Sequence, residues 1–245
     1  MRAIRKINLS IIFFVVLCPA CLVFAQEKLL PIESFVNHGD YLELKISPDG
    51  RHFAGRFRQK GTTSLLFIRR SDMKVVGGTS PGKGNIVHTV NWVTNDRVVF
   101  EFAEKHHYSD APISTGELFA TSIGGTPDIL YGYRASDEKV TSRISNRKND
   151  PASQELLSLL EDDEKHVLIM EHPWERKGNT YYDNRVKTPR ISKLNIYSGK
   201  KKRIESIPFK GASALASKYG DVNFIRWVDD ENNQRSAYRL SLIHI

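Results

Sequence analysis

Apolar and polar residues alternate along much of this chain, which is the pattern of half-buried β-strands. Two alternating runs, residues 42–46 and 53–57, flank the sequence Ser47-Pro48-Asp49-Gly50. Proline presets φ, aspartate can bond its own backbone and glycine accepts a positive φ, so this sequence predicts a tight reversal. The two runs and the turn therefore predict a β-hairpin.

The hairpin opens a repeat of four short strands, each bounded by turn residues. Strands are expected at residues 42–46, 53–57, 64–69 and 73–76 in the first copy, at 86–92, 98–102, 117–122 and 128–133 in the second, at 156–160, 167–170, 190–197 and 203–207 in a looser third, and at 224–228 and 236–239 in the first half of a fourth. The reversals start at residues 47, 94 and 161, and the first spacing of 47 residues matches the ~40–50-residue period of propeller repeats. We therefore predict an all-β fold, a partial β-propeller of about three four-stranded blades with the start of a fourth, and take a β-sandwich as the alternative.

The second spacing, 67 residues, is longer than the repeat. It predicts an insertion in residues 171–189, which contain two tyrosines and a tryptophan. Just before it, residues 151–160 permit a rival assignment, a short helix with Asp150 as its cap and Pro151 at the first helical position. We prefer a loop or a single helical turn that leads into the strand.

The three tryptophans have different expected roles. Trp92 and Trp227 end apolar runs, so we expect them in or near the core. Trp174 lies in the predicted insertion, where an aromatic side chain could face a ligand. A packed loop is the preferred interpretation of Trp174.

The first 25 residues have the organisation of a signal peptide. Three basic residues precede an apolar stretch at residues 7–16, and Val23-Phe24-Ala25 offers a small-residue cleavage site. The apolar stretch is shorter than the ~20 residues of a membrane span. We expect cleavage after Ala25, periplasmic or secreted localisation, and no membrane span afterwards, with an uncleaved anchor as the alternative.

Composition narrows the chemistry of the mature chain. Both cysteines, Cys18 and Cys21, lie in the predicted signal peptide, so disulfides and thiolate sites are excluded after cleavage. A lipoprotein at Cys21 is an alternative. Removing residues 1–25 leaves 220 residues and lowers the net charge from +8 to +5, because three positive charges are lost. Such a modest charge does not favour nucleic acid as a partner.

The last six residues, Leu-Ser-Leu-Ile-His-Ile at 240–245, are what CTG-TCT-CTT-ATA-CAC-ATC encodes, and this string resembles an adapter used in sequencing libraries. We expect them to be an artefact and the natural protein to continue past Arg239, with an ordinary short strand as the alternative. The predicted organisation is therefore a signal peptide at 1–25, an incomplete propeller at 26–239 and an artefact at 240–245.

Gly78-Thr79-Ser80-Pro81-Gly82 fits the G-x-S-x-G pattern of a nucleophile elbow. That chemistry needs the backbone N–H of the residue after the serine for the oxyanion hole, and Pro81 has none. The elbow should also open a helix, whereas Lys83-Gly84-Asn85 continues a loop. We therefore do not assign Ser80 as a catalytic residue and expect a connection between blades here.

Three other clusters of polar residues are explained more simply as ordinary surface residues. His106-His107, near Glu104 and Asp110, could suggest a metal, but adjacent strand residues point to opposite faces, so we expect a solvated loop. Glu161-Asp162-Asp163-Glu164 could suggest an acid and base pair, but carboxylates crowded into a turn are usually hydrated. Lys200-Lys201-Lys202-Arg203 could bind an anionic surface, but a charged hairpin suffices. We assign no catalytic, cofactor-binding or metal-binding residue and no cofactor.

Several stretches together resemble the start of exported bacterial members of the prolyl oligopeptidase family. They are Leu30-Pro31-Ile32-Glu33-Ser34-Phe35, Ile46-Ser47-Pro48-Asp49-Gly50-Arg51-His52-Phe53-Ala54, Asn91-Trp92-Val93-Thr94-Asn95-Asp96-Arg97-Val98, Asp162-Asp163-Glu164-Lys165-His166-Val167-Leu168-Ile169 and Leu194-Asn195-Ile196-Tyr197-Ser198-Gly199-Lys200. The likeness covers roughly residues 30–239. Ser-Pro-Asp-Gly by itself occurs in many propellers, including those of the Tol system, and the combination with the other stretches is more specific.

The resemblance implies a two-domain serine peptidase whose N-terminal propeller restricts access to a C-terminal α/β-hydrolase domain bearing Ser, Asp and His. No position of this chain matches the motifs of those triad residues. We therefore expect a non-catalytic propeller part of a periplasmic or secreted peptidase, with a peptide substrate and the hydrolase domain as partners. A stand-alone periplasmic propeller that binds a protein or an envelope component is the alternative, and a sugar- or metal-dependent propeller enzyme is a third hypothesis.

Overall fold

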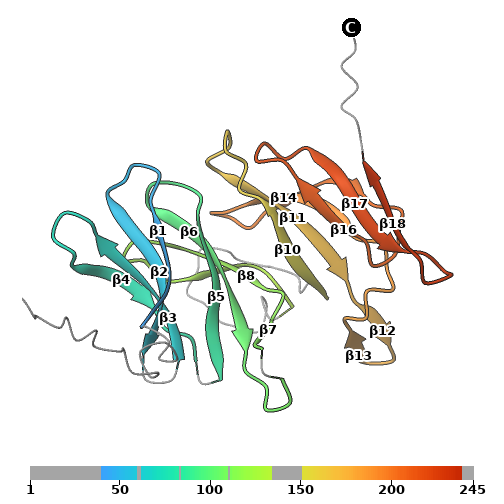
Figure 1. Ribbon diagram of the computed structural model, residues 1–245, viewed down its shortest axis with the longest axis horizontal. Helices are drawn as coiled ribbons and strands as arrows, with labels where there is room; N and C mark the ends of the chain where they lie inside the picture. Colours follow the sequence, from blue (N-terminus) through green and yellow to red (C-terminus); the bar gives the residue numbers. More distant parts are fainter. Residues whose placement is uncertain (1–39, 60–61, 83, 110, 134–150, 239–245) are drawn as a thin grey trace, which may run out of the picture. The chain divides into compact units, whose positions relative to one another are not determined.

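The computed structural model describes residues 40–59, 62–82, 84–109, 111–133 and 151–238, all within the second of the chain's two units, Gly39–Ile245. Every regular element of these residues is a β-strand (Figure 1). The described part accordingly contains no helix long and apolar enough to cross a membrane. The predicted signal peptide at 1–25 and the residues 240–245 lie outside it.

The strands of the described residues form four larger antiparallel sheets and one small hairpin. The first sheet consists of β1 (Tyr41–Ile46), β2 (His52–Gln59), β3 (Thr62–Arg69) and β4 (Val75–Thr79). The second consists of β5 (Asn85–Trp92), β6 (Arg97–Glu104), β8 (Leu118–Ser122) and β9 (Asp128–Tyr131), with β7 (Ile113–Ser114) also paired to β6. The third consists of β10 (Ala152–Ser158), β11 (His166–Pro173), β14 (Arg190–Asn195) and β15 (Lys201–Ser206), and the hairpin of β12 (Glu175–Lys177) and β13 (Thr180–Tyr182). The fourth consists of β16 (Ser213–Ala216), β17 (Val222–Val228) and β18 (Gln234–Tyr238).

The all-β prediction is confirmed. In each larger sheet the main strands pair in chain order, and each sheet is completed before the next begins. A β-sandwich would instead require connections that pass back and forth between two sheets. Successive antiparallel meanders of this kind are consistent with a β-propeller-like fold.

Apolar clusters lie between successive sheets, and the middle sheets bury both faces. In β6, Val98 and Phe100 belong to the cluster shared with the first sheet, and Val99 belongs to the cluster shared with the third. All three side chains are 0% exposed. Because neighbouring strand residues point to opposite faces, a strand buried on both faces becomes a continuous apolar run. A third cluster, which includes Met170 and Ala214, joins the third sheet to the fourth.

The first predicted reversal has the expected geometry. The N–H of Gly50 donates to the carbonyl of Ser47 at 2.8 Å, and Gly50 has φ +71°. The Ser47 hydroxyl donates to the carboxylate of Asp49 at 2.6 Å and accepts the N–H of His52 at 3.0 Å. Ser47 is 2% exposed, so its hydroxyl, and not water, is the hydrogen-bond partner of the turn backbone.

The prediction for the fourth copy is wrong in its strand order. Residues 224–228 lie in β17 and the described part of 236–239 lies in β18, which are the second and third strands of the sheet. The first strand is β16, whose four residues, Ser-Ala-Leu-Ala, include only one large apolar side chain and so carry little hydrophobic signal. The missed reversal is Ser217-Lys218-Tyr219-Gly220, in which the N–H of Gly220 donates to the carbonyl of Ser217 at 3.0 Å and Gly220 has φ +96°.

The prediction for residues 151–160 is right only in part. The strand expected at 156–160 is β10, but it starts at Ala152 and ends at Ser158, so residues 152–155 form neither a helix nor a loop. β10 pairs with β11 from Ala152 opposite Pro173 onward. Ala152 and Leu156 pack toward the second sheet and Leu157 toward the fourth, so the segment is held by contacts on both faces. These long-range contacts override the local helix-start signal of Pro151.

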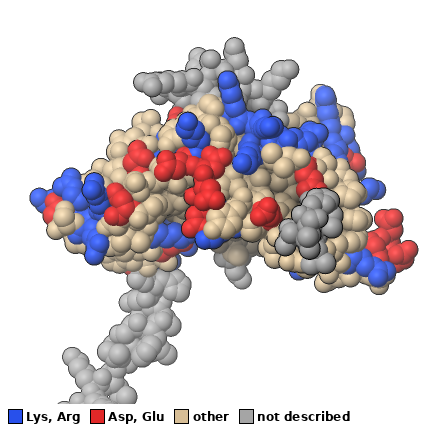
Figure 2. Space-filling model, turned by 90° about the horizontal axis from the view of Figure 1, so that it is seen from above, with Lys and Arg blue, Asp and Glu red and all other residues tan. Residues whose placement is uncertain are grey.

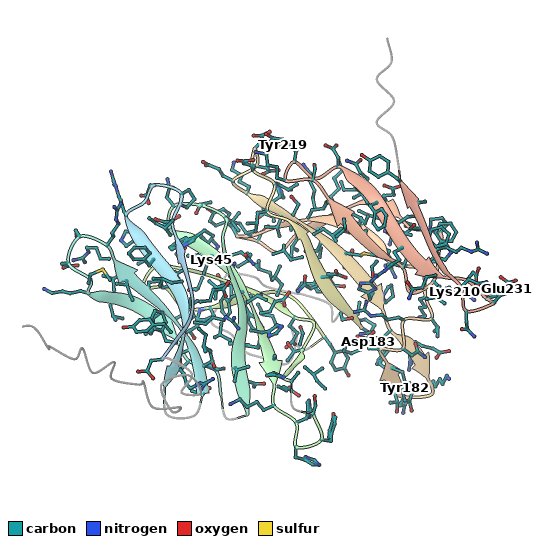
Figure 3. All side chains as sticks on the ribbon, in the orientation of Figure 1. Lys45, Tyr182, Asp183, Lys210, Tyr219 and Glu231 are labelled. Atoms are coloured by element: carbon teal, nitrogen blue, oxygen red, sulfur yellow. The ribbon has the colours of Figure 1, made fainter. Side chains whose placement is uncertain are left out.

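The predicted insertion at 171–189 is present, but it begins after Pro173 and not at residue 171. β11 continues to Pro173, and the added residues form the β12–β13 hairpin and the segment that follows it. The register Glu175↔Tyr182, Arg176↔Tyr181 and Lys177↔Thr180 makes this a short, tight hairpin. Asp183 immediately follows β13, and Figure 3 shows it at the opposite end of the third-sheet strands from Tyr219.

Candidate functional site

The reversal turns between the first two strands of each larger sheet border one cavity of about 730 Å³. This volume lies within the ~300–1,000 Å³ of small-ligand pockets. The lining residues are Pro48 from the first sheet, Asn91, Trp92, Val93, Thr94 and Asn95 from the second, Leu156, Leu157, Ser158, Leu159, Leu160, Glu161 and Glu164 from the third, and Ala216, Ser217 and Lys218 from the fourth. The cavity is a product of the repeat, because it gathers the same turn from each sheet.

The wall of the cavity is held in place by contacts between the first and second sheets. The Nε1 of Trp92 donates to the carbonyl oxygen of Lys45 at 3.0 Å, and its ring centroid lies 5.7 Å from that of Phe67. The ammonium of Lys45, labelled in Figure 3, donates to the Oδ1 of Asn91 at 2.8 Å. Trp92 is 7% exposed, which confirms its predicted place in the core. The predicted place of Trp227 is also confirmed, since it packs on the third cluster with its ring 3.8 Å from that of Phe209.

The other side of the cavity is closed by contacts between the third and fourth sheets. Lys218 forms an ion pair with Glu161, and this contact raises the pKa of the Lys218 ammonium. The carbonyl of Lys218 accepts two further hydrogen bonds, from the Ser158 hydroxyl at 3.0 Å and from the N–H of Glu161 at 2.9 Å. The reversals of these two sheets are therefore joined directly, and the charged pair lies at the rim of an otherwise leucine-rich wall.

The surface around the reversal turns carries both signs of charge. Figure 2 views the molecule from above Figure 1, and acidic and basic side chains lie close together on this face. A mixed surface does not produce the one-sign field that steers a highly charged partner. The cavity thus suits a ligand with an apolar body and small polar or charged groups at its rim.

The predicted acidic turn contributes to this site through only part of its length. Glu161 and Glu164 line the cavity, whereas Asp163 contacts other partners. Asp163 accepts from His166 Nδ1 at 2.9 Å and lies 3.6 Å from the ammonium of Lys193. Burial raises the pKa of Asp163, but the contacts with His166 and Lys165 outweigh it and the net pKa is lowered.

Ser80 lies away from the cavity, directly after the end of β4. Its hydroxyl accepts a hydrogen bond from the hydroxyl of Ser64 at 2.9 Å. The described residues that follow, Pro81, Gly82 and Gly84, form no helix before β5 begins. The strand-to-helix geometry of a nucleophile elbow is therefore missing from the described residues here.

The two adjacent histidines contact an aromatic ring. His106 stacks on Tyr108 with centroids 4.9 Å apart, and His107 meets the same ring edge-on at 5.4 Å. The Nε2 of His106 lies 3.6 Å from a carboxylate oxygen of Glu104. Asp110 lies outside the described residues. Among those that the structure describes, no group of three or more His, Cys, Asp or Glu side chains is arranged to hold a metal ion.

The basic run at 200–203 has one member with a buried partner. The ammonium of Lys201 lies 2.6 Å from a carboxylate oxygen of Glu171, which is 3% exposed, and 4.9 Å from the centroid of the Tyr131 ring. Glu171 also accepts hydrogen bonds from the hydroxyls of Ser192 and Tyr131. Burial raises the pKa of Glu171, but Lys201 and these hydroxyls outweigh it, so the net pKa is lowered. This cluster joins β11, β14 and β15 to β9 and is structural.

Trp174 belongs to a small aromatic cluster at the base of the β12–β13 hairpin. Its ring lies 5.1 Å from that of Tyr133, which lies 6.0 Å from that of Tyr181. The guanidinium of Arg176 lies 5.8 Å from the Tyr181 ring. The indole N–H of Trp174 is buried and has no hydrogen-bond partner among the described residues. The packed-loop interpretation of Trp174 is therefore supported.

Two further polar pairs, each with one buried side chain, have no counterpart among the sequence predictions. Glu101 accepts a hydrogen bond from the side-chain amide of Gln154 at 2.8 Å, and burial raises the pKa of its carboxyl group. His172 is 2% exposed, and its Nε2 lies 3.5 Å from the carboxylate of Glu155. The contact with His172 lowers the pKa of Glu155. The partners of each pair come from separate strands, so no local spacing in the sequence predicts that they meet.

No protein-family model matches the sequence. No curated protein matches it either. Among solved structures, oligopeptidase B from Leishmania major is similar at 12% identity over 80% of this chain and 24% of its own, with a TM-score of 0.44. Hydrazine synthase from Kuenenia stuttgartiensis is similar at 11% identity over 80% of this chain and 58% of its own, with a TM-score of 0.41.

TolB from Acinetobacter baumannii is a third similar structure, at 13% identity over 78% of this chain and 38% of its own, with a TM-score of 0.33. The chain thus spans less than two thirds of the length of each of these proteins. Their names differ in kind, and all three TM-scores lie below 0.5. The likenesses therefore assign neither a family nor an activity to this chain.

Proposed function

We propose that this chain is a β-propeller part of an exported serine peptidase of the prolyl oligopeptidase family. The observation that carries the proposal is the convergence of four reversal turns on one cavity. Three of these turns lie in the stretches that resemble the family, around Ser47-Pro48-Asp49-Gly50, around Trp92-Val93-Thr94-Asn95-Asp96-Arg97 and around Asp162-Asp163-Glu164. Sequence resemblance and tertiary position thus support the same account.

In this proposal the cavity is one mouth of the propeller channel. An extended peptide has side chains of varying polarity and backbone groups that need partners. The leucine-rich wall would contact the side chains, and the Glu161–Lys218 pair and Asn91 at the rim would accept or donate hydrogen bonds. Such a mouth would admit peptides and exclude folded proteins, because only a single extended, unfolded segment is narrow enough to enter it.

Catalysis in this proposal belongs to another domain. The Ser, Asp and His would lie in an α/β-hydrolase domain encoded after residue 239, and this chain would contribute the filter and the domain contacts. A periplasmic or secreted location follows from the predicted signal peptide at 1–25. No cofactor is part of the proposed reaction, because the triad chemistry needs none.

The decisive experiment is to sequence the gene downstream of the codon for Arg239. Several hundred further codons with a G-x-S-x-G elbow between a strand and a helix would support the proposal. A stop codon after one or two more four-stranded repeats would overturn it. That second result would favour a stand-alone propeller whose cavity binds a protein or envelope component.

A biochemical experiment addresses the chain itself. The purified chain should not hydrolyse chromogenic peptide substrates, because Ser80 has a serine hydroxyl as its hydrogen-bond partner and Pro81 cannot donate to an oxyanion. The matched control is the Ser80→Ala variant, which should behave identically. Turnover that Ser80→Ala abolishes would show that the serine is a nucleophile and that the division of labour proposed here is wrong.

A further inference from the structure

The strand β10 is the first of the third sheet and pairs with a neighbouring strand, β11, on one side only. We call its other side the free edge of β10. Near the start of the strand this edge has a partner, because the N–H of Gln154 donates to the carbonyl of Gly116 at 3.0 Å. Gln154 therefore directs its main-chain groups away from β11.

The free edge of β10 is unpaired at Leu156. Main-chain groups alternate between the two sides of a strand, so Leu156, two positions after Gln154, also directs its N–H and carbonyl away from β11. The shift in the register of β10 and β11 lies after Leu156 and leaves this alternation intact. Among the described residues, no backbone group bonds to this N–H or this carbonyl.

The cavity between the reversal turns borders this edge. Leu156 and Leu157 both line it, although Leu156 packs toward the second sheet and Leu157 toward the fourth. Side chains on opposite faces of a strand can line one cavity only where that cavity lies beside the edge of the strand. The unpaired main-chain groups of Leu156 and the apolar side chains therefore meet the same space.

The chemistry of the lining indicates which kind of segment fits beside the edge. Leu157 lies on one side of it and Leu159 on the other, so both faces of an added strand would contact leucine. Glu161 pairs with Lys218, which leaves Glu164 as a lining carboxylate without an ion pair among the described residues. An apolar side chain is therefore favoured there, and an acidic one is repelled.

We propose that this chain binds an extended, apolar peptide segment by strand addition to the free edge of β10. The main chain of the segment bonds to the N–H and carbonyl of Leu156, and its alternate side chains contact Leu157 and Leu159. Main-chain bonds supply affinity in this mode of recognition, and the contacts of alternate side chains supply specificity. That the ligand is a peptide rests on the function proposed above, whereas the edge and the leucines belong to the described fold.

The test is an NMR titration of the full chain labelled with ¹⁵N-leucine. The probe is the blocked, uncharged heptapeptide acetyl-Ser-Thr-Ser-Leu-Ser-Thr-Ser-amide, and the Leu156 amide signal is the one that the Leu156→Ile variant lacks. The expected result is a saturable downfield shift of this amide proton, with a Kd of about 1 mM or below, because the N–H gains a hydrogen bond. A Leu156 amide signal that does not move up to ~5 mM peptide overturns the proposal.

Methylated probes test whether the peptide pairs as a strand. In a paired strand, only every second N–H faces the partner, so N-methylation of the leucine and N-methylation of the following serine should have unequal effects. One of the two should weaken binding at least ~10-fold, because the methyl group removes the donor and occupies its place. Equal effects of the two methylations would show contact without strand addition and overturn the proposal.

A protein variant tests the place of the side-chain contacts. Leu159→Asp should weaken binding at least ~10-fold, because it puts a carboxylate into the apolar wall. The matched control is Val186→Asp, since Val186 is 43% exposed and does not line the cavity. Far-UV circular dichroism of each variant shows that the sheets are formed. Undiminished binding by Leu159→Asp would mean that the peptide binds elsewhere.

A changed probe gives the same information without altering the protein. The heptapeptide with aspartate in place of leucine should bind the wild-type chain at least ~10-fold more weakly, and equal binding of the two peptides would contradict the apolar site.

The peptidase proposal and the peptide site can fail separately. The gene sequence after the codon for Arg239 tests the peptidase, and the titration tests the edge. A hydrolase domain in the gene, with no shift at Leu156, would retain the peptidase and overturn the site. A gene without that domain, with the shift at Leu156, would retain the site in a stand-alone propeller.

Discussion

The guanidinium of Arg97 donates a hydrogen bond from its Nε to the main-chain carbonyl of Ile196 at 3.0 Å. The two residues are 99 positions apart: Arg97 begins β6 of the second sheet, and Ile196 directly follows β14 of the third. Arg97 is 6% exposed and also donates to Ser122 and to the carboxylate of Asp128, at 3.2 and 3.1 Å. A buried cation with several partners at a junction fixes how the sheets meet, because any slip would leave charged donors without acceptors.

Arg97→Ala should therefore lower the free energy of unfolding by about 2–4 kcal/mol. The change removes the hydrogen bonds to Ile196, Ser122 and Asp128 at once. Urea unfolding followed by circular dichroism measures the loss. Arg69→Ala is the control, since Arg69 is half-exposed and its pair with Asp72 should be worth less than ~1 kcal/mol. Equal losses for the two variants would contradict a special role for Arg97.

Glu171 should make the fold less stable in acid. Burial raises its pKa, but Lys201, Ser192 and Tyr131 outweigh burial, so the folded-state pKa lies below the ordinary value of 4.5. A lowered carboxyl pKa contributes stability that is present above pH 4.5 and is lost as the pH falls through the folded-state pKa. Glu171→Gln should remove this contribution. Unfolding free energies of both proteins between about pH 3 and pH 7 test it, and a constant difference between them would count against it.

Glu101 should have the opposite pH dependence. Burial raises its pKa above 4.5, and the hydrogen bond from Gln154 only partly offsets that effect. A raised carboxyl pKa contributes stability that is present below pH 4.5 and is lost as the pH rises through the folded-state pKa. Glu101→Gln should therefore be neutral or stabilising at about pH 7 and lose its advantage in acid. Strong destabilisation of Glu101→Gln near neutral pH would show that the ionised carboxylate is required.

Gly50→Ala should destabilise the first sheet by about 1–2 kcal/mol, because a residue with a Cβ is strained at φ +71°. Space is not the limit, since the nearest side-chain atom would lie 3.6 Å from the added Cβ. Gly82→Ala is the matched control: nothing lies within 4 Å of its added Cβ, and its φ lies outside the strained region. Thermal unfolding of the two variants should separate them by several degrees. Indistinguishable midpoints would mean that the reversal relaxes without cost.

Much of the fold follows from local patterns in the sequence. The alternating runs at 42–46 and 53–57 and the turn Ser47-Pro48-Asp49-Gly50 predict β1, β2 and their reversal, because period-two alternation and turn chemistry act within a few residues. The third strands of the first two sheets and β9 follow in the same way, whereas β4 lies at 75–79 and not at the predicted 73–76, where Met73 has φ +56°. The fourth reversal is predictable from the sequence as well, because Ser217 and Gly220 have the same spacing as Ser47 and Gly50.

The candidate site was not predicted, because its residues are ordinary when taken singly. Leu156, Leu159 and Val93 carry no chemical signature, and the pattern that includes them predicts only strands and turns. They line a cavity only because successive sheets bring the same turn to the same end. The pattern Gly-x-Ser-x-Gly shows the converse, since a motif that suggests chemistry lies where the described fold provides no elbow.

By itself the sequence determined most strands and turns of the first two sheets and the repeat, since these depend on side chains a few positions apart. Tertiary structure alone decided that the first strand of the third sheet starts at Ala152, because the contacts of Leu156 and Leu157 with two different sheets outweigh the helix-start signal at Pro151. The tertiary structure also raises the pKa of Glu101 and lowers the pKa of Glu171. Burial raises the pKa of both carboxyl groups. The net shifts are opposite because only Glu171 has an ammonium and two hydroxyls within hydrogen-bonding distance.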